Sequence, residues 1–496
     1  MSTSAPAATR RKDDGLGKRT ASAISLTFLT STSGRVMTMI TTFVLARLLT
    51  PHDFGIANLS SVLLAVVLPL TDIGIAQGLI RGAESTLSAT ARTAFWLVIA
   101  LGAGLYVLGA GFSGVIAQFF GEPDLGPVLV VTNLSIVVYA TSRIPSALLE
   151  RELLYSRKVM PEVIGSIVYS VLAVGLALLS FGYWSIVIAT LARSAVISAG
   201  LFVVTRWRPG ISFDVKVARE LISYARVLLA SSMLRLAYTN VDNMIVGKVL
   251  GVTALGYYAM AYNLGNLLAT QIAGAVGTGL FPAYSRMLPD KDRVRSAMLV
   301  ILRYTGLVIT PLTICGVITV PYLVPIVIGA KWLPMTTALQ VILIYGWLRT
   351  VAPIYWTLML VEDMRRDTLL INLVSLAVAL AVAYPVVTNW GFVGIAIEFT
   401  LLEVVRTIWM ALAIKFRLNA GLLSQMAQLW PGIAASAVVG LLLIAALRSP
   451  IGGSTLALLA EIAVAGALYL GLLVLFGQLG KKQLMMAGSV LQKRGG

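Results

Sequence analysis

Charged side chains recur inside long apolar stretches of this chain, where carrying a charge is costly. Eight arginines fall in such stretches: Arg35, Arg143, Arg193, Arg226, Arg235, Arg303, Arg349 and Arg406. Five carboxylates do so as well: Asp72, Asp242, Glu398, Glu403 and Glu461. A guanidinium group can hold two phosphate oxygens at once, and carboxylates inside a membrane often bind protons or ions. These residue types predict a site for a phosphate-bearing anion, with Asp72 and Asp242 as candidates for binding a coupling H⁺ or Na⁺.

The depth of each arginine separates binding candidates from structural ones. Four arginines lie near the middle of their apolar stretches, so we expect them to face a wet cavity or an anion. They are Arg35, Arg193, Arg235 and Arg349.

Three other arginines lie within about a turn of the end of a stretch, where a long side chain can reach the interface. They are Arg143, Arg226 and Arg303. Arg406 follows Glu403 by three residues. Because residues three apart share one face of a helix, this spacing predicts a structural ion pair.

The stretches that hold these residues are long enough to cross a bilayer, which takes about 20 apolar residues. The chain has 496 residues, of which 58% are hydrophobic and 12% are charged. That charged fraction is about half of the value typical of soluble domains. The sequence therefore predicts an all-α polytopic membrane protein with about 14 spans. We place them near 22–48, 55–80, 94–119, 126–148, 159–180, 183–204, 224–249, 256–281, 299–320, 336–361, 369–388, 391–413, 428–447 and 455–477.

The net charge of +17 is distributed unevenly across these spans. If the N-terminus is cytoplasmic, 26 of the 38 lysines and arginines lie in cytoplasmic loops and tails, and 4 lie in the opposite loops. This bias is the positive-inside rule and predicts that both termini are cytoplasmic. The charge is therefore an orientation signal, with anionic membrane lipids as a partner, and does not indicate nucleic-acid binding.

A short connecting segment occurs twice in the sequence. ARLLTPHDFGI (46–56) superposes without a gap on GKVLGVTALGY (247–257), with an offset of 201. Six predicted spans separate the two copies, so both face the same way. This pattern predicts two parallel repeats, as in transporters built from two similar halves.

The repeat defines the expected organisation of the chain. Between the halves, ISFDVKVARELI (211–222) predicts a short helix lying on the cytoplasmic face. The expected parts are an N-tail (1–21), an N-lobe of spans 1–6 (22–204), a linker (205–223), a C-lobe of spans 7–12 (224–413), two additional spans (428–477) and a C-tail (478–496).

Two such halves predict a cleft that opens alternately to each side. Adding the offset of 201 to Arg35 gives position 236, beside Arg235, so each half would place an arginine at a similar height. Arg235, Tyr238 and Asp242 lie on one stripe of span seven. We interpret the cleft as cationic, although internal pairing of arginines with acids would also explain these residues. The candidate substrate-binding residues are Arg35, Arg193, Arg235, Tyr238 and Arg349.

The sequence resembles the polysaccharide-transport (Wzx-type) flippases of the multidrug/oligosaccharidyl-lipid/polysaccharide exporter superfamily. The stretches that carry the resemblance are LARLLTPHDFGIANL (45–59), TDIGIAQGLIR (71–81), NVDNMIVGKVLGVTALGYYAMAY (240–262), GLFPAYSRM (279–287) and VIGAKW (327–332). They anchor both halves.

The resemblance implies a V-shaped bundle of two lobes, with spans 1, 2, 7 and 8 lining the cleft and spans 13 and 14 facing lipid. It implies an undecaprenyl-diphosphate-linked oligosaccharide as substrate, turned from the cytoplasmic to the periplasmic leaflet of a bacterial inner membrane. The translocated oligosaccharide would be used to assemble capsule, exopolysaccharide or O-antigen. The resemblance implies a polymerase and glycosyltransferases as partners of the flippase. No catalytic residue is implied.

Other readings remain open at this point. A lipid II flippase would also move a polyprenyl diphosphate, whereas a drug exporter of the same superfamily would need an acid-rich cleft. A membrane glycosyltransferase or polymerase is a further alternative, for which Glu122-Pro123-Asp124 is an outer acidic pair. The loop is short, and we interpret it as a turn.

Signals for other chemistry are weak. There is no G-x-x-x-x-G-K-[ST] loop for ATP. The single histidine, His52, has no neighbouring cysteine, so no metal site is predicted. We interpret the single cysteine, Cys315, as a packing residue.

Overall fold

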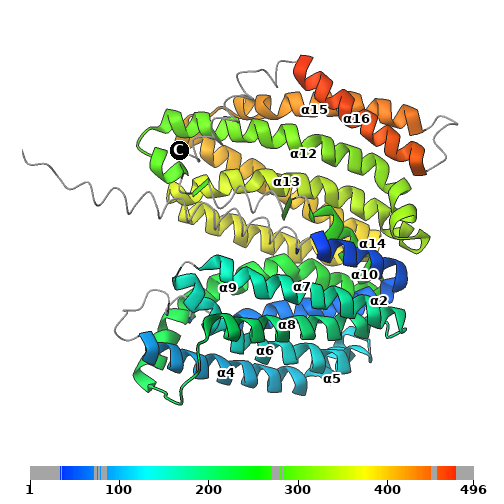
Figure 1. Cartoon of the computed structure of the whole chain (residues 1–496). Helices are drawn as coiled ribbons and strands as arrows, with labels where there is room; N and C mark the ends of the chain where they lie inside the picture. Colours follow the sequence, from blue (N-terminus) through cyan, green and yellow to red (C-terminus); the bar gives the residue numbers. More distant parts are fainter. Residues whose placement is uncertain are drawn as a thin grey trace, which may run out of the picture. The chain divides into compact units, whose positions relative to one another are not determined.

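The computed structural model describes residues 34, 36–71, 75, 79, 87–152, 154–267, 269–270, 280–281, 283–447 and 455–475; for residues 155, 224–238, 365, 455–459 and 475 it describes the backbone alone. Within these ranges every regular element is helical and no strand occurs (Figure 1), which confirms the all-α prediction. Nine of the described helices are long and apolar enough to cross a membrane. The protein is therefore a multi-pass membrane protein, and the total of 14 spans stays a prediction.

The described helices fall in two halves of the chain. In the N-terminal half they are Val36–Leu48, α2 (Pro51–Val67), η1 (Leu68–Thr71), α4 (Leu87–Gly111), α5 (Ser113–Phe120), α6 (Leu125–Arg151), α7 (Tyr155–Leu178), α8 (Tyr183–Thr205) and α9 (Val215–Leu250). In the C-terminal half they are α10 (Val252–Gly265), α12 (Lys291–Val327), η3 (Ala330–Met335), α13 (Thr336–Val361), α14 (Arg365–Leu418), α15 (Leu422–Leu447) and α16 (Thr455–Leu475).

The chain folds into two compact units. Unit 1 comprises Met1–Asn240 with Gly251–Thr253, and unit 2 comprises Val241–Leu250 with Ala254–Gly496. In unit 1, α6 and α8 pack on each other, with α4 against α6 and α7 against α8. In unit 2, α12 packs on α13 and α15, and α13 packs on α14. Each unit has its own buried apolar clusters.

The repeated connection has the same local structure in both copies. One helix ends at Leu48 and α2 begins at Pro51; another ends at Leu250 and α10 begins at Val252. The two starting residues are 201 positions apart, as the sequence offset predicts. In the first copy the turn is fixed by a capping box, in which Thr50 and Asp53 each bond to the other's backbone N–H.

Asp53 also joins this connection to α8. Its carboxylate accepts a hydrogen bond from the backbone N–H of Tyr183 at 3.0 Å. Gly182 precedes that residue with φ +54°, and a Cβ there would lie 2.8 Å from the Asp53 oxygen. A single carboxylate therefore caps the start of two helices.

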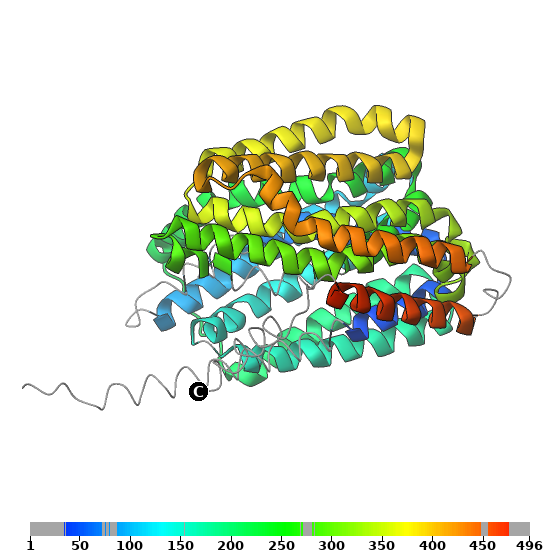
Figure 2. The ribbon, with the colours of Figure 1, turned by 90° about the horizontal axis from the view of Figure 1, so that it is seen from above.

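Element α14 contains two of the expected spans. Residue Gly391 has φ 61° and ψ −155°, which breaks the helix in the middle. Arg406 donates a hydrogen bond to Asn372 at 3.3 Å, although 34 residues of one straight helix would extend about 51 Å. The chain therefore reverses at Gly391, and its two segments run antiparallel beside each other (Figure 2).

The expected linker helix differs from the observed one. We expected a separate short helix over 211–222, but a helix begins at Val215 and continues without interruption to Leu250. Asp214 caps its start by accepting from the backbone N–H groups of Lys216 and Val217. The sequence between the linker and span seven contains neither glycine nor proline, so nothing in it ends the helix.

Candidate functional site

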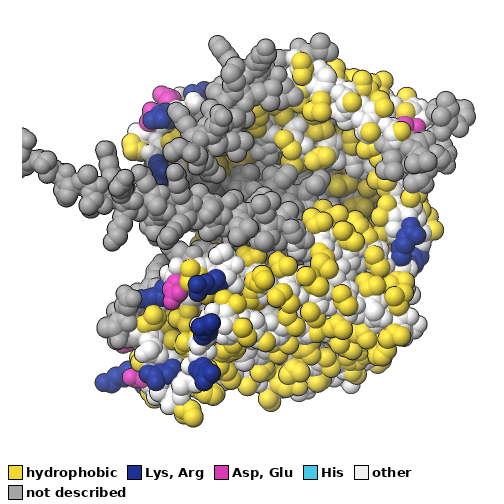
Figure 3. Space-filling model, viewed as in Figure 1, with side chains coloured by type: hydrophobic (Ala, Val, Ile, Leu, Met, Phe, Trp, Pro, Cys, Tyr) yellow, Lys and Arg dark blue, Asp and Glu magenta, His cyan; other side chains and the backbone are white. Residues whose placement is uncertain are grey.

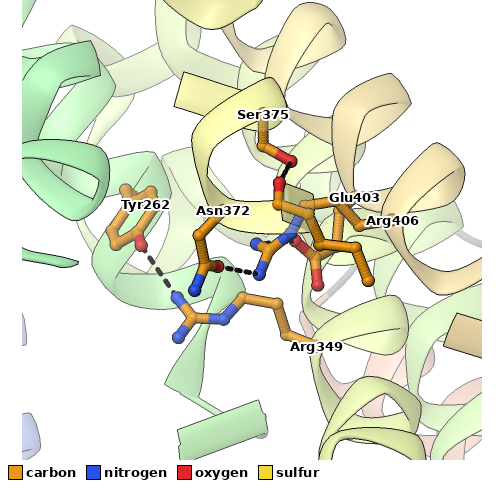
Figure 4. Close-up of polar contacts among 7 residues, drawn as sticks. Tyr262, Arg349, Asn372, Ser375, Glu403 and Arg406 are labelled. Atoms are coloured by element: carbon orange, nitrogen blue, oxygen red, sulfur yellow. Dashed lines mark hydrogen bonds and ion pairs between the residues drawn. The ribbon is translucent and has the colours of Figure 1, made fainter. Parts of the chain in front are cut away.

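The side chain of Arg349 lies beside Tyr262 in unit 2 (Figure 4). Its guanidinium donates a hydrogen bond to the Tyr262 hydroxyl at 3.1 Å. The same group lies 5.7 Å from the centre of the Tyr345 ring, and the two tyrosine rings are 6.2 Å apart. Such a cation–aromatic contact orients a charge without neutralising it. No described carboxylate accepts a hydrogen bond from Arg349, which is half-buried.

Two glycines bring the helices of this site together. Gly265 lies three residues after Tyr262 on α10, and Gly346 lies three residues before Arg349 on α13. A Cβ on Gly346 would lie 2.5 Å from the carbonyl oxygen of Gly265, so the two backbones touch. Because side chains three apart share a helix face, this contact places the tyrosine and the arginine opposite each other.

The α14 hairpin adds an ion pair beside Arg349. Arg406 and Glu403 form a 3.0 Å ion pair, and Arg406 also reaches Asn372 on the other segment (Figure 4). This confirms the pair that their spacing predicted. Glu403 is also within electrostatic range of Arg349. One carboxylate therefore balances part of the charge of two arginines.

Asp242, on α9, is fully enclosed by protein at 1% exposure. Its carboxylate accepts a hydrogen bond from the Tyr258 hydroxyl at 2.8 Å and from the Asn243 amide at 3.1 Å. The Tyr258 ring lies 6.3 Å from that of Tyr262, the partner of Arg349. Aromatic contacts thus link the Asp242 carboxylate to the arginine site.

Glu398 is a residue to which the sequence assigned no role. It is 7% exposed, and neither carboxylate oxygen has a hydrogen-bond partner among the described residues. It is also within electrostatic range of Asp242. A local signal was available, because no lysine or arginine lies three or four residues away, in contrast to Glu403.

The structure does not test the other predicted site residues. Arg193 lies on α8 in unit 1, within electrostatic range of Tyr169 on α7. Arg35 and Asp72 lie outside the described residues, as do the side chains of Arg235 and Tyr238, although α9 keeps the last two on one helix. Their roles therefore stay predictions.

The described part of the site is mixed in charge. It contains two arginines and three carboxylates, while Arg35 and Arg235 of the predicted cationic cleft lie outside the described side chains, so the cationic cleft stays a prediction. Tyrosine and asparagine, not arginine, are the described hydrogen-bond partners of Asp242. This arrangement separates a charge that could bind an anion, on Arg349, from carboxylates that could bind a cation.

The outer acidic pair of the sequence forms a turn. Glu122 and Asp124 lie in the short connection between α5 and α6, which confirms the predicted turn. His52 approaches Glu122 at 3.5 Å. In the part of the chain that the structure describes, no group of three or more His, Cys, Asp or Glu side chains is arranged to hold a metal.

We expect Gly346→Ala to destabilise the protein and to weaken the arginine site. The added methyl group meets a backbone carbonyl that cannot rotate away, so α10 and α13 must separate. Overpacking of this kind costs about 1–3 kcal/mol. Thermal unfolding in detergent would show a lower midpoint.

Gly466→Ala on α16 is the matched control, because a Cβ there has no neighbour within 4 Å among the described atoms. An unchanged midpoint for Gly346→Ala, with the control also unchanged, would contradict the close helix contact.

Comparisons with known proteins agree with the fold and indicate a family. A family model described as "Polysaccharide biosynthesis protein" matches residues 44–337. The chain is 26% identical over 374 residues to the lipopolysaccharide biosynthesis protein WzxC of Escherichia coli (strain K12), covering 74% of each chain. It is 24% identical over 277 residues to the succinoglycan biosynthesis transport protein ExoT of Rhizobium meliloti (strain 1021), covering 55% of each chain.

Among solved structures, the lipid II flippase MurJ in its inward closed conformation is similar, with a TM-score of 0.75. The match covers 91% of this chain and 99% of that chain at 13% sequence identity. At this identity the likeness concerns the fold alone, and it confirms a transporter-type helical fold.

Proposed function

The chain belongs to the polysaccharide biosynthesis protein family whose model matches residues 44–337, and from this premise we propose that it is a flippase for lipid-linked oligosaccharides. The substrate is an undecaprenyl-diphosphate-linked repeat unit, moved from the cytoplasmic to the periplasmic leaflet of a bacterial inner membrane. Relatives named for lipopolysaccharide biosynthesis and succinoglycan transport support this cargo class. The activity is transport rather than catalysis.

The observation that carries the proposal is the placement of Arg349. Its guanidinium is held by Tyr262 and Tyr345 and donates no hydrogen bond to a described carboxylate. A guanidinium group inside a membrane-spanning helix costs free energy unless it binds an anion or faces a water-filled cavity. In the proposal it holds the diphosphate through paired N–H donors.

Further arginines complete the proposed binding site. Arg35 and Arg235 would contribute from equivalent places in spans one and seven, and Arg193 and Tyr238 are additional candidates. The polyprenyl tail would stay in lipid while the sugar crosses through water. A membrane potential that is negative inside contributes about 2.3 kcal/mol per charge per 100 mV, which drives the anionic cargo outward.

A coupling ion enters the proposal through the carboxylates. Asp242 and Glu398 are both buried and within electrostatic range of each other. Two negative charges in an apolar region repel each other and lack water, so a shared H⁺ or a bound Na⁺ would stabilise the pair. Asp72 remains a candidate from sequence. An ion bound by these carboxylates would stabilise one conformation of the alternating-access cycle relative to the other.

The orientation is also part of the proposal. The excess of lysines and arginines in alternate loops supports cytoplasmic placement of both termini. A polymerase and glycosyltransferases of the same pathway would supply and consume the cargo. Cysteines introduced in place of Arg47 and Arg92 would be labelled with a reagent that does not cross the membrane. Labelling at position 47 from the periplasmic side and at position 92 from the cytoplasmic side would support this orientation.

We expect deletion of the gene to leave undecaprenyl-diphosphate oligosaccharide on the cytoplasmic leaflet and to stop surface polysaccharide formation. Lipid extracts analysed by mass spectrometry would identify the cargo, and leaflet accessibility to a membrane-impermeant sugar oxidant would identify the step. A complemented strain is the control. Normal surface polysaccharide in the deletion strain, with no accumulated lipid, would contradict the proposal.

Lipid II transport is the alternative favoured by the fold likeness to a lipid II flippase. If expression of this chain rescues cells that have been depleted of their own lipid II flippase, that result would support the alternative. Failure to rescue, together with accumulation of oligosaccharide lipid in the deletion strain, would support the repeat-unit cargo.

A further inference from the structure

The segment between α8 and α9, residues 206–214, is fixed against the start of α4. The Trp96 indole donates a hydrogen bond to the Gly210 carbonyl at 3.1 Å, and the Asp214 backbone N–H donates to the Thr93 hydroxyl at 3.1 Å. The Trp207 ring packs at 5.2 Å on Phe95. Three contacts along nine residues hold this segment in one conformation.

This fixed segment nevertheless presents apolar side chains to the exterior. Ile211 is 97% exposed, Phe213 53% and Val215 63%. At the start of α9, Ala218 and Leu221 face the buried core. Exposed apolar patches on an ordered segment indicate an interaction surface.

Basic side chains surround these apolar residues. Arg206, Arg208, Lys216 and Arg219 are all exposed, and Figure 3 shows Lys and Arg gathered at this end of unit 1, beside a hydrophobic flank. Of the nearby acids, Asp214 caps α9 and Glu220 is exposed.

Exposed apolar side chains surrounded by basic ones are typical of a protein surface that lies in the membrane interface. Apolar side chains enter the boundary between headgroups and acyl chains, while basic ones meet lipid phosphates. Tryptophans such as Trp96 and Trp207 are enriched at the same depth. A water-soluble anion would be recognised by the basic groups and would leave Ile211 and Phe213 in water.

We propose that residues 206–222 form an anionic-lipid platform, in which Ile211 and Phe213 insert into the leaflet and Arg208, Lys216 and Arg219 bind phospholipid headgroups. The occupant is anionic phospholipid of the surrounding bilayer. The platform joins the first repeat to α9, so headgroup binding acts on the helix that leads into unit 2. This inference needs only that the chain spans a membrane and goes beyond the proposed cargo.

The single native cysteine makes a direct test practical. In a Cys315→Ser background, Ile211→Cys is labelled with an environment-sensitive fluorophore and the full-length protein is placed in nanodiscs containing brominated lipids. Discs of phosphatidylcholine alone are compared with discs containing one quarter phosphatidylglycerol. Glu220→Cys is the matched control, because its exposed side chain lies outside the apolar group.

We expect stronger quenching at position 211 than at position 220, increasing with phosphatidylglycerol. The variant Arg208→Gln/Lys216→Gln/Arg219→Gln should lower the preference for phosphatidylglycerol by about a hundredfold, since each of the three basic residues contributes roughly fivefold. Replacing Arg208 and Arg219 with lysine should restore most of the preference. Thermal unfolding checks that each variant is folded.

Three outcomes would overturn the platform. One is a label at position 211 that is no better quenched than the label at 220. Another is quenching that is equal in both lipid compositions, which means membrane contact without headgroup binding. A third is loss of the signal on adding inorganic pyrophosphate, which would assign the basic groups to a diphosphate. None of these readouts requires transport, so they are separate from failure of the proposed function.

Discussion

Arg349→Gln is expected to reduce translocation of the lipid-linked oligosaccharide about a hundredfold. Glutamine keeps a hydrogen-bond donor for Tyr262 but removes the charge and the paired donors proposed for the diphosphate. Hydrogen bonds to charged groups contribute about 1.5–3 kcal/mol each, and about 2.7 kcal/mol corresponds to a hundredfold change. Proteoliposomes with a fluorescent polyprenyl-diphosphate oligosaccharide would measure the rate, and surface polysaccharide would measure the effect in cells.

Two further variants separate charge from geometry. Arg349→Lys keeps the charge without the planar fork and should lose about tenfold. Arg303→Gln on α12 is the matched control, because we expect that arginine to reach the interface, and it should translocate at close to the normal rate. Wild-type translocation by Arg349→Gln, at normal protein levels, would remove this residue from the proposed mechanism.

The second large effect concerns the buried carboxylates. Asp242→Asn together with Glu398→Gln should abolish the dependence of translocation on an imposed proton or sodium gradient. Neutral amides need no compensating cation, whereas two buried carboxylates do. We expect the gradient to accelerate the wild-type protein by at least about tenfold, and the double variant not at all; a bound ion that shifts an equilibrium by about 1.4 kcal/mol has this effect.

Separate gradients identify the ion. Acceleration by a pH gradient in sodium-free buffer indicates H⁺, whereas acceleration by sodium at equal pH indicates Na⁺. Glu461→Gln on α16 is the matched control, since this intramembrane glutamate lies outside the cluster, and it should keep the gradient response. An undiminished response in the double variant would show that the coupling ion binds elsewhere.

Much of the architecture could be read from the sequence because it depends on local patterns. Apolar runs of spanning length predicted a helical membrane protein, and the structure confirms this. The repeated connection predicted equivalent helix starts, which the structure has at Pro51 and Val252. The ion pair of Glu403 with Arg406 was also predictable, because a spacing of three residues fixes a shared helix face.

The prediction of a separate linker helix was wrong because it used only the local sequence pattern. Residues 211–222 have an amphipathic pattern, which predicted a separate surface helix. The pattern is real, because Ala218 and Leu221 are buried and Val215 and Ile222 are exposed. Helix continuity, however, depends on the absence of a breaker after the segment, and α9 continues into span seven.

The sequence by itself determined the helical membrane class, the repeated connection and the residue types that could bind an anion or a cation. Only the tertiary structure decided which of them meet. Arg349 contacts Tyr262 across 87 residues, and Asp242 on α9 accepts a hydrogen bond from Tyr258 on α10. Such contacts depend on how closely helices cross, which here follows from one glycine against another and from the reversal at Gly391. Hydrophobic periodicity specifies the face that a helix buries, but not the partner that it meets.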